Sequence, residues 1–320
     1  MGNKRPLCLV FIIMLFFVIS CSSYKKNVVQ SKCENIKFVQ LSDLHVGKEK
    51  AENEKRLKKV VDHLNKKVKP DFVIITGDLV QGDLFQKSKD TYITVKNILD
   101  KLHFPYYVLE GNHDNKKLLA ETFNIPFDNN EKELIYPLIS KKEVDFILLG
   151  TLNEAQRNTG KLTPDKIFQL KKQLDQRKDK EVFLLFHHPP VEKNDLKNIE
   201  ELLDKKLYKN IEGMLDERSY KNILDFKNKD LLINLLKKHP NVTHVSSGHL
   251  HLGRSYVKNN ITFTLAPSIS CPEGPLHDSF AKMKNSPIYV RKEPSFILFK
   301  KEACKPFSFE FKSVPFAQGF

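Results

Sequence analysis

Short apolar runs recur along the chain, separated by longer stretches in which apolar residues repeat every three or four positions. The runs are rich in branched and aromatic residues, as buried strands are. They span residues 36–41, 72–76, 106–109, 146–149, 182–186 and 242–245. The longer stretches predict amphipathic helices at residues 52–67, 87–102, 163–176 and 229–238. Strands that alternate with helices predict an α/β fold with a largely parallel core sheet, covered on both faces.

The pattern changes after Gly253. Residues 254–264, 296–300 and 307–311 have the composition of strands, and no helical pattern lies between them. We therefore expect the carboxyl-terminal part to add an antiparallel ribbon to the sheet. Upstream, Thr163-Pro164-Asp165 predicts a helix start, because a capping residue is followed by proline in the first turn.

Composition indicates one sizeable domain, which we place at residues 36–313, with a tail at 314–320. The chain has 320 residues, of which 40% are hydrophobic and 29% charged, as in an ordinary globular protein. Its net charge of +14 comes from lysines scattered along the chain rather than from one basic block. This charge suits a small anionic substrate, and without a basic stripe interleaved with aromatics we expect no specific nucleic-acid partner.

The amino terminus predicts export. Lys4 and Arg5 precede an apolar run at residues 7–19, too short for a comfortable membrane span and typical of a signal peptide, here residues 1–20. Val18-Ile19-Ser20-Cys21 resembles a bacterial lipobox, in which Cys21 would carry the lipid. Residues 21–35 would form a tether. The chain would then be a lipoprotein anchored at the membrane of a bacterial cell envelope; the alternative is an uncleaved anchor with an incidental cysteine.

Two further features leave alternatives open. Beyond the leader, Cys33, Cys271 and Cys304 allow at most one internal disulfide, and their spacing is not that of a metal site. Residues 192–228 are dense in lysine, leucine and asparagine. This segment is either a solvated surface excursion or a lid insertion over the site.

Polar clusters of similar chemistry follow five of the apolar runs. Ligands in an open α/β sheet bind beyond the carboxyl ends of the strands, so these clusters would converge on one site. They are Ser42-Asp43-Leu44-His45, Gly77-Asp78, Gly111-Asn112-His113-Asp114, His187-His188-Pro189-Pro190 and Gly248-His249-Leu250-His251. Any one of them could be a helix cap or a turn. Caps and turns do not explain why imidazole, carboxylate and amide recur together at the same structural position.

A pair of metal ions explains the recurrence. Two ions held close together need oxygen ligands and neutral imidazoles, and one carboxylate must bridge them to offset their repulsion. Asp-x-His and His-x-His supply two ligands from one segment, because residues two apart in an extended chain point the same way.

In their order and composition, these motifs resemble those of the calcineurin-like metallophosphoesterases, and the resemblance covers roughly residues 36–270. It implies a four-layer αββα sandwich with a dinuclear metal site at the strand ends. The length, His-His-Pro-Pro and Ala266-Pro267-Ser268 are similar to the class III cyclic-nucleotide phosphodiesterases and the related glycerophosphodiesterases.

The resemblance also implies a role for each residue of the site. Asp43, His45 and His251 would hold one ion, and Asn112, His187 and His249 the other. Asp78 would bridge two ions of iron, manganese or zinc. His113 would stabilise or protonate the leaving oxygen, with Asp114 orienting it from behind. For His188 we expect a structural part or one behind the metal ligands.

The implied reaction is hydrolysis of a small phosphodiester by a hydroxide that bridges the metals, without a protein nucleophile. The same site could serve a phosphomonoesterase or nucleotidase, and a non-enzymatic binding lipoprotein is a third reading. The chain departs from its nearest subfamilies at Gly150-Thr151-Leu152-Asn153 and in the length of segment 192–228. Both departures bear on the substrate rather than on the metal ligands.

Overall fold

The computed structural model describes residues 34–47, 51–81, 88–128, 133–191, 195, 225–270 and 293–316. These residues belong to one compact unit, Cys33–Phe320. The expected signal peptide, the lipidation site Cys21, most of the tether and most of segment 192–228 lie outside the described residues. None of the helices within the described ranges combines the length and apolarity that a membrane crossing requires.

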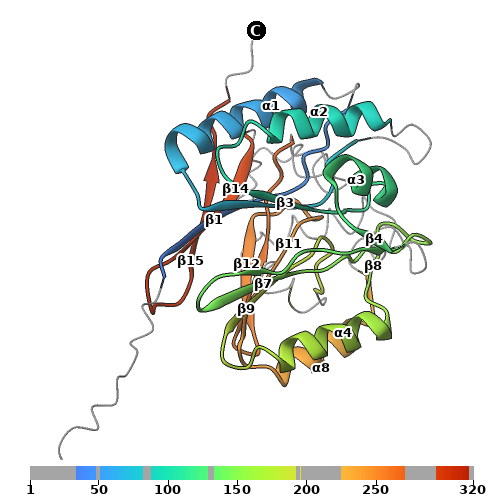
Figure 1. The fold of residues 1–320 in the computed structure, drawn as a ribbon, viewed down its shortest axis with the longest axis vertical. Helices are drawn as coiled ribbons and strands as arrows, with labels where there is room; N and C mark the ends of the chain where they lie inside the picture. The colour runs from blue at the N-terminus through green and yellow to red at the C-terminus, as the bar shows by residue number, and fades with distance from the viewer. Residues whose placement is uncertain are drawn as a thin grey trace, which may run out of the picture. The chain divides into compact units, whose positions relative to one another are not determined.

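Two mixed sheets stack face to face, with helices on the outer side of each (Figure 1). The first sheet has the order β15-β14-β1-β2-β3, and the second has the order β12-β13-β11-β9-β7-β6. Helices α1 (Ala51–His63) and α2 (Lys89–Leu99) cover the first sheet, and α4 (Pro164–Asp175) and α8 (Lys229–Lys237) cover the second. The predicted α/β class and the four-layer arrangement are confirmed.

Apart from β13, the parallel strands have the bounds that their apolar runs predicted, within one or two residues. In the first sheet they are β1 (Ile36–Leu41), β2 (Phe72–Thr76) and β3 (Tyr106–Leu109). In the second they are β7 (Val144–Leu148), β9 (Glu181–Leu185), β11 (Val242–Ser247) and β13 (Ile261–Leu265). A short antiparallel strand, β6 (Ile139–Ser140), forms one edge of the second sheet. Such runs are recognisable because both faces of the strands are buried.

The carboxyl-terminal strands differ from the expectation of one ribbon on one sheet. Residues 254–264 form a hairpin, β12 (Arg254–Lys258) and β13, because Asn259 and Asn260 both take positive φ at the turn. This hairpin joins the second sheet. Strands β14 (Ser295–Lys301) and β15 (Ser308–Ser313) join the first sheet instead, with β14 antiparallel to β1.

Smaller elements complete the described part. Helix α3 (Lys116–Phe123) was not predicted, and a π-helical turn (Leu64–Val68) ends the first predicted helix. The predicted start at Thr163 is confirmed, since its side chain accepts a hydrogen bond from the Lys166 N–H. The short strands pair as β4 (Phe127–Asp128) with β5 (Glu133–Leu134), and β8 (Gly160–Lys161) with β10 (Phe226–Lys227). Cys304 is disulfide-bonded, and the other cysteines lie outside the described residues.

A core of aromatic rings joins the two sheets. Phe38 of β1 meets Phe146 of β7 and Phe183 of β9 edge to face, with ring centroids 5.1 and 5.3 Å apart. Such edge-to-face pairs are favoured by the ring quadrupoles. The next residue, Val39, points the other way, into the apolar cluster beneath α1 and α2. Burial on both faces thus fixes each central strand against a sheet and a helix layer.

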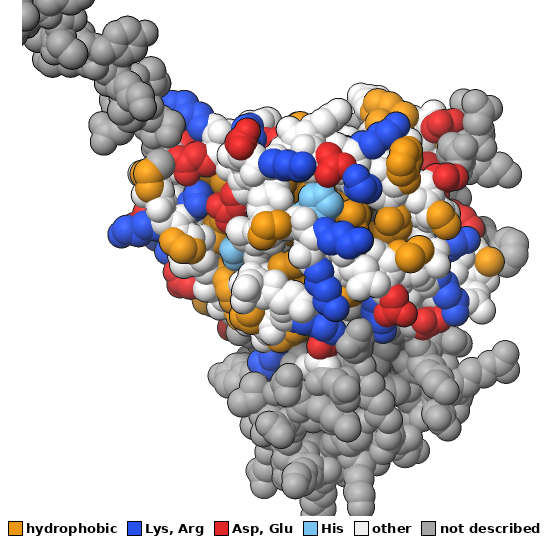
Figure 2. Space-filling view, turned by 90° about the horizontal axis from the view of Figure 1, so that it is seen from below, with side chains coloured by type: hydrophobic (Ala, Val, Ile, Leu, Met, Phe, Trp, Pro, Cys, Tyr) orange, Lys and Arg blue, Asp and Glu red, His pale blue; other side chains and the backbone are white. Residues whose placement is uncertain are grey.

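In the space-filling view (Figure 2), the charged side chains of the described residues do not gather into one block. On the face drawn in Figure 2, lysine and arginine side chains are interspersed with acidic and apolar ones. This distribution agrees with the scatter of lysines along the sequence.

Candidate metal centre

Both sheets contribute to one polar site at the carboxyl ends of their parallel strands. From the first sheet, Asp43 and His45 follow β1, Asp78 follows β2, and Asn112 follows β3. From the second sheet, His187 follows β9, and His249 and His251 follow β11. The convergence expected for the five motifs is therefore present in the structure, across two sheets rather than one.

The backbone of the site is held in an unusual conformation. Asp43, His45, Asp78, His249 and His251 all have φ between 44° and 70°, which is rare for residues other than glycine. Backbone hydrogen bonds between the loops hold part of this conformation, since the His45 N–H donates to the Asp78 carbonyl oxygen at 2.9 Å. Clustered backbone strain of this kind is found at functional sites, where the surrounding fold imposes it.

Glycines allow the strand-end loops to approach one another. A Cβ on Gly111 would lie 2.2 Å from Asp78 Oδ1, and one on Gly248 would lie 2.0 Å from Ser42 Oγ. Side chains at these two positions would push the loops apart, which explains why the motifs contain glycine there.

Asp43, His45 and His251 form the first group of donors. His251 Nε2 lies 3.2 Å from Asp43 Oδ1 and 3.3 Å from His45 Nε2. Ligand atoms that share one ion at about 2.0–2.2 Å lie about 3.0–3.5 Å apart, which these distances match. The Nδ1 atoms of His45 and His251 are buried and have no hydrogen-bond partner among the described residues. The Nε2 atoms of the two rings, 3.3 Å apart, face the shared space.

Asn112, His187 and His249 form the second group. Asn112 Oδ1 lies 2.9 Å from His187 Nε2 and 2.8 Å from His249 Nδ1. His187 Nδ1 is 2.7 Å from the Thr76 carbonyl oxygen, to which it must donate its proton. Burial disfavours protonation of His187, but Asp78 and Asp43 outweigh it and raise the pKa of this ring. Once the ring is neutral, its Nε2 lone pair faces the lone pairs of Asn112 Oδ1. A cation between these atoms would resolve that repulsion.

Asp78 lies between the two groups. Its Oδ2 is 3.6 Å from His45 Nε2 in the first group and 3.5 Å from His187 Nε2 in the second. Its other oxygen, Oδ1, accepts the His113 N–H at 2.7 Å. One carboxylate oxygen is thus positioned to serve two neighbouring ions.

The electrostatic state of the site also suits cations. Burial lowers the pKa of His45 to about 4 and that of His249 to about 3, so both rings are neutral near pH 7. Burial would raise the pKa of Asp43, but the neighbouring His251 holds it below its usual value. For Asp78 the three histidines His187, His113 and His45 likewise outweigh burial and lower the pKa. Ionised carboxylates and neutral imidazoles are the forms that bind metals.

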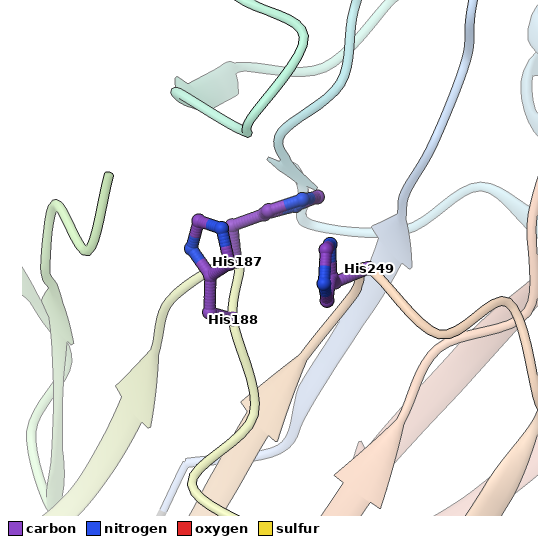
Figure 3. Close-up of side chains that lie close together, drawn as sticks. All are labelled: His187, His188 and His249. Atoms are coloured by element: carbon purple, nitrogen blue, oxygen red, sulfur yellow. The ribbon is translucent and has the colours of Figure 1, made fainter. Parts of the chain in front are cut away.

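His188 lies beside the second group but has other partners. Figure 3 shows its ring together with His187, from the segment after β9, and His249, from the segment after β11. His188 Nδ1 lies 3.0 Å from Thr151 Oγ1, and Nε2 lies 2.9 Å from the Arg157 carbonyl oxygen. With both nitrogens engaged, this ring anchors the loop after β7 rather than offering a free lone pair.

His113 and Asp114 differ in exposure. The His113 side chain is half-buried, and its ring centroid lies 4.8 Å from that of His45, at the edge of the first group. Asp114 is fully buried and accepts hydrogen bonds from the Gly111 and Leu79 N–H groups and from the Tyr92 hydroxyl. These bonds hold the Asn112–His113 loop; that Asp114 also orients the His113 ring stays a prediction.

Several residues around the site were not identified from the sequence. The Arg157 guanidinium donates to the carbonyl oxygens of Asn112 and Asp114, and Asn158 Oδ1 accepts from Asn112 Nδ2 at 3.3 Å. The Asn53 amide donates to the His45 carbonyl oxygen at 2.9 Å. Arg157 and Asn158 lie in the loop after β7, four and five residues beyond Asn153, and no motif in the sequence pointed to them. Asn53 gave no signal in the sequence either, because a polar residue in an amphipathic helix is ordinary.

Comparison with known proteins agrees with this geometry. The model of the calcineurin-like phosphoesterase family matches residues 36–253. A protein from Arcobacter nitrofigilis, described as a probable glycerophosphodiester phosphodiesterase, is 28% identical over 248 residues, which cover 72% of this chain and 78% of that protein. One from Vesicomyosocius okutanii, described as a probable cyclic nucleotide phosphodiesterase, is 22% identical over 242 residues, 74% of this chain and 86% of that protein.

Solved structures share the fold. A dimetal phosphatase from Danio rerio superposes with a TM-score of 0.59 at 13% identity, covering 88% of this chain and 96% of that one. A Plasmodium protein described as the anchor in the inner membrane complex gives a TM-score of 0.50 at 14% identity, over 88% and 85% of the two chains. The same architecture thus occurs in proteins with very different descriptions, and the fold by itself does not decide activity.

Proposed function

Because this chain belongs to the calcineurin-like phosphoesterase family, whose model covers residues 36–253, we propose that it hydrolyses small phosphodiesters at a centre of two metal ions. As a member of this family with buried His/Asp clusters at the strand ends, it is a metallophosphoesterase. The observation that carries the proposal is the position of Asp78 Oδ2, within 3.6 Å of a histidine in each donor group.

The donors divide between the two ions as the two groups suggest. Asp43, His45 and His251 would hold one ion, and Asn112, His187 and His249 would hold the other, with Asp78 shared. Iron, manganese and zinc all suit this mixture of imidazole and oxygen ligands. When bound, such a pair of ions supplies a nucleophile from water at neutral pH and stabilises charge on the phosphoryl oxygens.

The chain's own residues orient the substrate and handle the leaving group. His113 is half-buried at the edge of the donor groups, and its backbone is tied to Asp78, so its ring is available to a bound phosphoryl group. We assign to it the stabilisation or protonation of the leaving oxygen. Asp114 supports it by holding the loop. Direct attack by water would leave no residue covalently phosphorylated.

The preference for diesters is supported by the descriptions of the relatives from Arcobacter nitrofigilis and Vesicomyosocius okutanii. A phosphomonoesterase or nucleotidase is the second candidate, because the same donors can serve either ester class. The test is a parallel assay of the purified full-length chain, loaded in turn with manganese, iron and zinc. Bis-p-nitrophenyl phosphate, p-nitrophenyl phosphate and cyclic AMP would be the substrates.

Each assay outcome has a clear meaning. Faster turnover of the diesters supports the proposal, whereas faster turnover of p-nitrophenyl phosphate supports the monoesterase. Loss of all activity across the panel, in protein that binds metal, would favour a non-enzymatic binding module.

We further propose that the protein is exported and anchored to the membrane of a bacterial cell envelope through a lipid on Cys21. The support is the sequence of residues 1–21 alone. Metabolic labelling with a radioactive fatty acid should mark the wild-type chain and not Cys21→Ala. Equal labelling of both would refute the anchor.

A further inference from the structure

The two halves of the metal centre come from different sheets, so something must fix the distance between them. Asp43, His45, Asp78 and Asn112 follow strands of the first sheet, whereas His187, His249 and His251 follow strands of the second. Directly beneath the site the aromatic core between the sheets gives way to polar side chains. Gln40 of β1 is the central one and is fully buried.

Gln40 bonds to both sheets at once. Its Nε2 donates to Thr76 Oγ1 of β2 at 2.9 Å and approaches the Ser247 carbonyl oxygen of β11 at 3.4 Å. Its Oε1 accepts a hydrogen bond from Ser246 Oγ of β11. Ser246 Oγ also lies 2.5 Å from Thr264 Oγ1 of β13, which extends the network one strand further into the second sheet.

The partners of Gln40 lead directly to candidate metal ligands. The Thr76 carbonyl oxygen accepts a hydrogen bond from the His187 Nδ1–H at 2.7 Å. Ser247 ends β11, one glycine before His249. In the first sheet, Asp43 lies three residues after Gln40 along the chain. A change in the Gln40 bonds would therefore be transmitted to donors of both groups through short, buried connections.

Stability alone does not require an amide here. Burying an amide costs free energy unless every hydrogen bond is made, and apolar residues of similar shape often serve a core equally well. Two residues earlier on the same face of β1, Phe38 already joins the sheets through ring packing. Hydrogen bonds, in contrast to ring packing, define the separation of the strands to a few tenths of an ångström.

We propose that Gln40 is a positioning residue that sets the spacing between the two halves of the metal centre, and so the affinity for the pair of ions. The inference rests on the proposed function, because it assumes that the site binds two ions. It assigns to Gln40 an indirect role, through Thr76 and Ser247, without contact to the metals.

The test replaces Gln40 by methionine, whose side chain has a similar length but lacks the amide group that makes these hydrogen bonds. Metal-free, full-length protein would be titrated calorimetrically with Mn²⁺, and its unfolding measured in parallel. We expect roughly 10-fold weaker binding, since partners behind metal ligands commonly contribute 10–100-fold to affinity. Ser246→Ala removes one arm of the connection only, and we expect a smaller loss in a chain that folds even where Gln40→Met does not.

Lys301→Met is the matched control. Lys301 of β14 also joins the two sheets, through a 2.8 Å ion pair with Glu181 of β9, but at the opposite end of the strands. Its loss should lower stability and leave Mn²⁺ affinity unchanged. Equal losses of affinity in Lys301→Met and Gln40→Met would show that Gln40 has only a general structural role.

A double-mutant cycle with Thr76→Val tests the route. If Gln40 acts through the Thr76 hydroxyl, the double variant should bind Mn²⁺ more tightly than two independent losses predict. Wild-type protein that binds two ions while Gln40→Met and Ser246→Ala bind them equally well would overturn the inference alone. Wild-type protein that binds no ion under any loading condition would overturn the proposed function and this inference with it.

Discussion

His244 gives a prediction whose size follows from the structure. It lies on β11 between the sheets, far along the strand from the metal centre, and its ring stacks on Phe183 with centroids 5.0 Å apart. Burial lowers its pKa from 6.5 to about 4, although Glu181, 3.9 Å away, favours the charged form. The positive charge of Lys301 lowers the pKa of His244 further. The folded protein therefore holds this imidazole neutral through the mildly acidic range.

The consequence is a loss of stability in acid. Because the folded pKa lies below the unfolded one, the unfolded chain binds more protons between pH 4 and 6.5. The stabilising contribution is thus complete above pH 6.5 and is lost as the pH falls toward 4. A difference of this size lowers the free energy of unfolding by about 2 kcal/mol at pH 5 relative to pH 8.

Urea unfolding of wild type and His244→Phe at pH 5, 6 and 8, with a chelator present, measures this contribution. Phenylalanine keeps the stacking on Phe183 and does not titrate. We expect wild type to lose about 2 kcal/mol more than the variant between pH 8 and pH 5. Val245→Ala, a buried neighbour on β11, controls for destabilisation that does not depend on pH. Parallel pH profiles for wild type and His244→Phe would refute the reasoning.

Three further predictions concern the metal centre. Asp78→Ala should lose both ions and all activity, whereas His113→Ala should keep its ions and turn over about 10²- to 10⁴-fold more slowly. Metal analysis of the two variants tests these roles, and equal metal loss in both would contradict them. Asn158→Ala should weaken binding of one ion about 10-fold, because the Asn112 amide is then free to turn, and stepwise titration would reveal whether one affinity changes alone. Turnover of a phosphorus-labelled diester should leave the protein unlabelled and invert configuration at phosphorus; a trapped phosphorylated side chain would exclude direct attack by water.

The strands, the family and the set of motif residues could be predicted because each depends on short-range pattern. A strand buried on both faces is a run of apolar residues, and a polar cluster that follows it lies at the strand's carboxyl end. The Asp-x-His and His-x-His pairs each lie within three residues of sequence, so they can be recognised as ligand pairs without knowledge of the fold. Helix α3 and the hairpin at residues 254–264 were missed, because short elements carry little periodicity.

Only the tertiary structure decided how the residues pair. His45 and His251 are 206 positions apart, and their 3.3 Å approach exists only because β1 and β11 belong to sheets that face each other. His187 and His188 are the same residue type in adjacent positions. Their different surroundings follow from Thr76 on one side and from Thr151 and Arg157 on the other. Side-chain chemistry is written in the sequence, whereas the hydrogen bonds that aim each ring depend on contacts between distant segments.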